Sequence, residues 1–127
     1  MNNRQLKDLL YEQVARIGKA LASPKRLELL EMLAQGEKSV DALAAELSID
    51  IKLASAHLKA LRDARLVTSR REGKFIHYRL TGPDVAGLGV KLREVAEDAT
   101  EKALVPIVRR AALSTMDPNF IPLMLFY

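Results

Sequence analysis

The stretch from Ser39 to Leu80 most constrains the fold, because it predicts two short helices followed by a two-stranded ribbon. Ser39 is a suitable N-cap for the first helix, whose apolar residues recur at helical spacing. Asp50 is a suitable N-cap for a second helix that runs to Ala64. Because only three residues link the two helices, the stretch 39–64 predicts a helix-turn-helix, whose second helix suits the major groove of DNA.

The second of these helices has two unlike sides. We expect its inward side to carry Ala54, Leu58 and Leu61, with Leu66 beyond its end. Other sides carry polar and basic residues, namely Lys52, Ser55, His57, Lys59 and Arg62. Ile51 and Leu53 could touch thymine methyls if they are exposed, and for Leu53 a place in the core is favoured.

Residues 66–80, called the wing from here on, follow directly. Two β-rich runs, 66–71 and 75–80, are joined by a turn in which Gly73 can take the positive φ that such a turn needs. The wing is basic, through Arg70, Arg71, Lys74 and Arg79. We expect Arg70, Arg71 and Lys74 to reach phosphates or the minor groove. His77 and Tyr78 are adjacent in a strand, so they point to opposite faces and one of them packs inward.

At these residues the chain resembles the ArsR/SmtB family of small bacterial repressors. The resemblance covers roughly residues 10 to 82, and its landmarks are Ala22–Leu27, Ser55–Arg62, Arg71–Lys74 and His77–Leu80. It implies a homodimer that binds an imperfect inverted repeat in double-stranded DNA, with repression relieved by an inducer.

The chain departs from this family at the inducer sites. Ser39 and Asp41 stand where many relatives carry a Cys-x-Cys pair, and residues 83–127 contain no histidine for a metal site on the C-terminal helix. The chain has no cysteine at all, so paired cysteines that sense persulfides are also absent. The inducer is therefore unknown, and we expect it not to be a metal held by cysteines.

The fold class predicted is mainly α with a small β-hairpin, as one winged helix-turn-helix domain over residues 1–127. Residues 1–22 and 83–113 are expected to form dimerisation helices, because their apolar positions exceed what a small core can use. The interface residues expected are Leu6, Leu10, Val14, Leu88, Leu92 and Val95. Alternatively, the apolar residues of the helix expected over 83–113 pack on the chain's own core instead of on a second copy. Pro106 is expected to interrupt or kink its helix, and residues 114–127 form an apolar tail of unknown role.

Charge favours nucleic acid as the partner. Between Lys52 and Arg79 eight Lys or Arg side chains stand against two carboxylates, in a chain whose net charge is +4. A basic face can be merely solvated, but on a helix-turn-helix it indicates phosphate contacts. Ser55 and His57 are candidates for base edges or phosphates, and Lys52 and Lys59 for phosphates. For His57, support of the helix-turn-helix is the alternative role.

Other function classes find little support. With two histidines, no cysteine and no glycine-rich phosphate loop, the sequence predicts no catalytic residue, metal site or cofactor. No apolar run is long enough for a membrane span, and a cytoplasmic location is expected. A winged-helix module that docks proteins without specific DNA binding is the rival reading, and the basic wing speaks against it.

Overall fold

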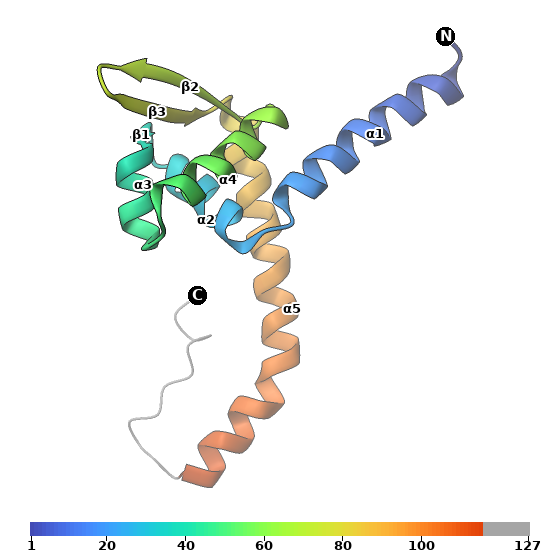
Figure 1. Cartoon of the computed structure of the whole chain (residues 1–127). Coiled ribbons are helices and arrows are strands. Elements are labelled where there is room, and N and C mark those ends of the chain that lie inside the picture. The colour runs from blue at the N-terminus through green and yellow to red at the C-terminus, as the bar shows by residue number, and fades with distance from the viewer. Residues whose placement is uncertain (116–127) are drawn as a thin grey trace. The chain divides into compact units, whose positions relative to one another are not determined.

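The computed structural model describes residues 1–115, which form five helices and three strands (Figure 1). Contacts between residues divide the chain into two units, Met1–Gly89 and Val90–Tyr127. The elements are α1 (Asn3–Leu21), α2 (Pro24–Leu33), β1 (Lys38–Ser39), α3 (Val40–Leu47), α4 (Ile51–Asp63), β2 (Val67–Glu72), β3 (Phe75–Leu80) and α5 (Pro83–Thr115).

Polar side chains cap the helix starts, and two of these residues, Ser39 and Asp50, are the predicted N-caps. The Ser23 hydroxyl accepts a hydrogen bond from the backbone N–H of Arg26, with Pro24 at the first helical position of α2. The Ser39 hydroxyl accepts from the N–H of Ala42 at 3.1 Å. The Asp50 carboxylate accepts from the N–H of Lys52 at 2.7 Å, so it stabilises the start of α4.

The turn between α3 and α4 uses a strained residue. Ser48 has φ 54°, a left-handed conformation that costs a non-glycine residue about 1 kcal/mol or more. Two hydrogen bonds offset this cost, from the N–H of Ser48 to the carbonyl of Ala45 and from that of Ile49 to the carbonyl of Ala44. These bonds close the end of α3 as a Schellman motif does, and they reverse the chain before α4.

The wing is an antiparallel hairpin, and a third short strand extends its sheet. The strand order is β1-β3-β2, with Val67 opposite Leu80 and Glu72 opposite Phe75. Gly73 has φ 61° in the turn, as predicted. The two-residue strand β1, which pairs with β3, was not predicted. Thr81 closes the base of the hairpin, because its hydroxyl donates to the carbonyl of Arg65 at 3.1 Å.

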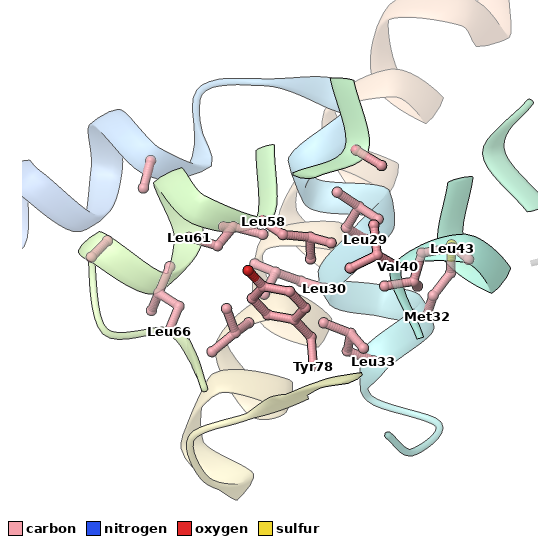
Figure 2. Packing of buried hydrophobic residues seen from close by; sticks show 14 of the residues in the cluster. Leu29, Leu30, Met32, Leu33, Val40, Leu43, Leu58, Leu61, Leu66 and Tyr78 are labelled. Carbon is pink, nitrogen blue, oxygen red and sulfur yellow. The ribbon is translucent and has the colours of Figure 1, made fainter. Parts of the chain in front are cut away.

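The core lies between α2, α3, α4 and the sheet (Figure 2). Its fully buried large side chains are Leu29, Leu43, Leu58, Leu61 and Val67. The predicted inward residues Ala54, Leu58, Leu61 and Leu66 are all buried, and Tyr78 is the wing residue that packs inward. No polar or charged side chain is buried among the residues that the structure describes.

One core expectation was wrong. Leu53 is 46% exposed, because α4 turns it away from the buried side that holds Ala54 and Leu58. On α2, Leu27 is exposed, whereas Leu29, Leu30, Met32 and Leu33 are buried. Since α2 has apolar residues on nearly every side, its periodicity could not select the buried face.

The helix α5 runs from Pro83 to Thr115 as one element, with Pro106 inside it. Pro106 was expected to interrupt or kink its helix, and the expectation that the helix is interrupted there is wrong. A proline removes one backbone donor, and here helical structure continues on both sides of it. Of the apolar tail predicted over residues 114–127, residues 116–127 lie outside the described residues.

Truncation of the core leucine Leu58, by Leu58→Ala, should lower the free energy of unfolding by about 2–5 kcal/mol, because the side chain is fully buried. The matched change Leu53→Ala should stay within about 0.5 kcal/mol, since that leucine is half exposed on the same helix. Urea unfolding followed by circular dichroism measures both. Equal losses for the two variants would contradict this assignment of the buried face.

Candidate nucleic-acid interface

One exposed side of α4 carries the predicted polar and basic residues other than His57, with Ile51 at its start. Ile51, Ser55 and Lys59 are each four positions apart, and Arg62 follows three later, so all lie along one side of the helix. Lys52 lies next to this row. We call these five residues, Ile51, Lys52, Ser55, Lys59 and Arg62, the α4 stripe. All five are exposed, while Ala54, Leu58 and Leu61 lie on an adjacent side of the helix, in the core.

The α4 stripe continues onto the wing. The Arg62 guanidinium donates from Nη1 to the Ser69 hydroxyl at 3.3 Å. Ser69 is paired with the buried Tyr78, and Arg71 is paired with Ile76 two residues further along each strand. Because paired residues share a face and faces alternate along a strand, Arg71 lies on the same ribbon face as Ser69. Helix and wing therefore present basic side chains on adjoining surfaces.

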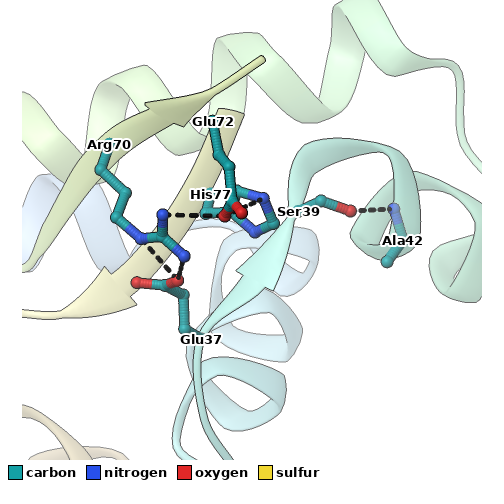
Figure 3. Close-up of polar contacts among 6 residues, drawn as sticks. All are labelled: Glu37, Ser39, Ala42, Arg70, Glu72 and His77. Atoms are coloured by element: carbon teal, nitrogen blue, oxygen red, sulfur yellow. Dashed lines mark hydrogen bonds and ion pairs between the residues drawn. The ribbon is translucent and has the colours of Figure 1, made fainter. Parts of the chain in front are cut away.

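Arg70 lies on the other face of the ribbon, where two carboxylates hold it (Figure 3). Its Nε donates to Glu37 at 2.8 Å, and its Nη1 donates to Glu72 at 2.9 Å. The hydrogen bond from Arg70 lowers the pKa of Glu37 below its ordinary value, and the same contact raises the pKa of Arg70. His77 Nε2 lies 3.7 Å from the Glu72 carboxylate. The positive charge of Arg70 is thus largely compensated within the protein.

The wing tip combines a cation and an aromatic ring. Lys74 Nζ lies 5.5 Å from the centre of the Phe75 ring, within the range of a cation–π contact. Lys74 and Arg79 are both exposed, but Arg79 is paired with Thr68 and lies on the Arg70 face of the ribbon. The structure therefore separates the predicted wing residues into Arg71 on the Ser69 face, Lys74 at the tip, and Arg70 with Arg79 on the opposite face.

His57 is placed apart from the α4 stripe. Its side chain is half-buried, and its pKa is lowered, first by burial and second by the positive charge of Arg26. Arg26 in turn donates to the carbonyl of Ala20 near the end of α1. Of the two roles considered for His57, this environment favours support of the helix-turn-helix over contact with a base.

Comparison with known proteins agrees with this geometry. The family model described as "Bacterial regulatory protein, arsR family" matches residues 23–69. A probable mercury resistance operon repressor of Streptomyces lividans is 36% identical over 68% of this chain and 70% of its own length. The chain belongs to the ArsR family. The predicted family is confirmed.

Solved structures of ArsR-type proteins confirm the predicted winged helix-turn-helix fold. The solution structure of a homodimeric winged helix-turn-helix DNA-binding domain from Mycobacterium bovis, described as a possible ArsR-family regulator, has a TM-score of 0.71 and 44% identity. The match covers 80% of this chain and 93% of that domain. An HTH-type transcriptional regulator of Mycobacterium tuberculosis is 47% identical over 72% of this chain. The match spans only about two fifths of that relative (41%).

Within residues 1–115, as far as the structure describes them, no group of three or more His, Asp or Glu side chains is arranged to hold a metal ion. In the same part of the chain no helix is long and apolar enough to cross a membrane.

Two residues of this ArsR-family structure were not anticipated from sequence. Glu37 holds Arg70 across 33 positions, and Arg26 connects the end of α1 to the surroundings of His57. Neither contact follows from a local pattern, because the partners come together only through the tertiary fold. In the sequence, the only sign of the contact between Glu37 and Arg70 was that an acidic residue, Glu37, stands just before the helix-turn-helix without an assigned role.

The neutral state of His57 should make stability depend on pH. Its folded pKa lies below the ordinary value of about 6.5, so the unfolded chain takes up a proton first as pH falls. Stability from this residue is therefore present above about pH 6.5 and is lost as pH falls through the folded pKa. Thermal unfolding at pH 7.5 and 5.5 should show a smaller pH effect for His57→Gln than for the wild type. The same pH effect in the wild type and in His57→Gln would contradict this.

Proposed function

We propose that this ArsR-family protein is a homodimeric transcriptional repressor that binds double-stranded DNA with an imperfect inverted repeat. The observation that carries the proposal is the α4 stripe, which adjoins the wing through the contact between Arg62 and Ser69. Such a surface matches a helix in the major groove with a wing beside it. No catalytic activity is proposed for the chain. The proposed location is the cytoplasm, where the DNA lies.

Within this proposal the residues of α4 divide by chemistry. Lys52 and Lys59 are exposed at the edge of the helix and contact phosphates, which contribute affinity without sequence preference. Ser55 lies between them with a short side chain, so its hydroxyl can reach a base edge when the helix sits deep in the groove. Arg62 holds the helix to the wing and adds positive charge where the two meet.

The wing contributes a second set of contacts. Arg71 and Lys74 reach phosphates beside the groove, because Arg71 shares the ribbon face of Ser69 and Lys74 is at the tip. Arg70 acts chiefly within the protein, since its two carboxylate partners must release it before it can bind a phosphate. Arg79 lies on that same face of the ribbon and takes a peripheral position.

The dimer uses apolar side chains that the single chain leaves in solvent. On α1, Leu6, Leu10 and Val14 recur every four residues and are each at least half exposed. On α5, Leu88, Leu92 and Val95 are also exposed, by 39%, 41% and 64%. Aliphatic rows of this kind are covered by a second copy in a twofold dimer. Such a dimer presents two recognition helices about one duplex turn apart, roughly 34 Å.

Release from DNA needs a signal whose chemistry differs from thiolate coordination. The chain has no cysteine, so a metal bound by cysteines or a persulfide taken up by a cysteine pair cannot be that signal. The inducer in this proposal is therefore a ligand or modification that acts through other side chains.

Loss of one phosphate contact should be visible in the salt dependence of binding. For Lys59→Ala, the slope of log affinity against log salt should fall in magnitude by about 2, because each dimer loses two contacts worth about 0.9 each. The affinity should fall on all duplexes alike. Fluorescence anisotropy from 50 to 300 mM salt measures the slope. The exposed Lys91, on α5, gives the matched control Lys91→Ala, which should change nothing; equal effects of the two variants would move the interface away from α4.

A charge in the apolar row of α5 should separate the dimer. Leu92→Glu should yield monomers in sedimentation velocity, because a carboxylate buried between two copies costs several kcal/mol. Leu27 on α2 is exposed to the same degree, 40% against 41% for Leu92, so Leu27→Glu is the matched control and should remain dimeric. A dimeric Leu92→Glu protein would place the interface elsewhere.

A further inference from the structure

An aliphatic side chain heads the otherwise polar α4 stripe. Ile51, the first residue of α4, is 50% exposed, and Ser55, Lys59 and Arg62 follow it along the same side of the helix. The exposed side chain of Ile51, which lies next to lysine side chains, makes no favourable interaction with water. A partner that presents both an apolar group and anionic groups at that place would satisfy Ile51 and Lys52 together.

A second exposed aliphatic residue lies nearby but on another side of α4. Leu53 is 46% exposed, close to the value for Ile51. It precedes the half-buried His57 by four residues, so it shares the side of the helix that approaches Arg26. Leu53 is therefore close to Ile51 in sequence, size and exposure. Unlike Ile51, it lies outside the row that contains Ser55 and Lys59.

In the major groove of DNA the apolar group that a base edge displays is the C5 methyl of thymine. The first turn of a recognition helix contacts base edges. We propose that Ile51 determines sequence preference by packing against the C5 methyl of a thymine in each half-site, while Lys52 and Lys59 bind the flanking phosphates. This assignment rests on the proposed function, because it requires α4 to enter the major groove.

Replacement of thymine by deoxyuridine tests the contact at the level of one methyl group. A duplex selected by the full-length protein from random DNA is resynthesised with one thymine of one half-site replaced at a time. Burial of one methyl group contributes about 0.8 kcal/mol, so deoxyuridine should weaken wild-type binding about fourfold at one or two positions. Ile51→Ala should bind thymine and deoxyuridine equally at those positions. Leu53→Ala should keep the fourfold difference.

The possible failures are distinguishable. If no duplex is selected, the proposed DNA-binding function fails, and this assignment fails with it. If a duplex is selected but deoxyuridine has no effect at any position, or Ile51→Ala keeps the same difference, DNA binding stands and the role of Ile51 is wrong. Loss of the difference in Leu53→Ala as well would also contradict the assignment, because the two leucine-sized side chains lie on different sides of α4. Circular dichroism of both variants should match the wild type, since both residues are exposed.

Discussion

Burial of Leu58 and Leu61 is the interaction on which the rest of the structure depends. Both side chains are fully enclosed by α2, α3 and the sheet, so the rotation of α4 about its own axis is determined by the core. Once that rotation is set, Lys52, Ser55 and Lys59 must face solvent. The chemistry of the exposed side is therefore a consequence of how the buried side packs, and the tight turn at Ser48 sets where the helix begins.

Electrostatics then distinguishes residues that composition treats alike. Arg62 and Arg71 lie on adjoining surfaces, whereas Arg70 is held by Glu37 and Glu72. Glu37 precedes β1, which pairs with β3, so the ion pair and the strand pairing both connect the wing to the segment before α3. Such exposed pairs contribute little to stability, but they can restrict the orientation of a hairpin. Arg70 is better understood as a residue that positions the wing than as a phosphate ligand.

Much of the fold could be predicted from the sequence because its signals are local. Ser39 and Asp50 cap the helices as expected, and Gly73 forms the wing turn. The failures involve information that local patterns lack. The strand β1 has two residues, too few for an alternating pattern, and Leu53 is apolar without belonging to the buried face. The family could be recognised from short motifs, while the opposite placement of Arg70 and Arg71 required the strand register.

The most direct test of DNA binding through α4 and the wing is a map of backbone amide shifts in NMR spectra during titration with a selected duplex. The largest changes should cluster at the exposed positions of Ile51–Arg62 and at Arg71–Lys74. The backbone amides of those α2 residues whose side chains lie in the core should change little. Changes concentrated on α2, or an absence of changes along α4 at saturating DNA, would contradict the proposed interface.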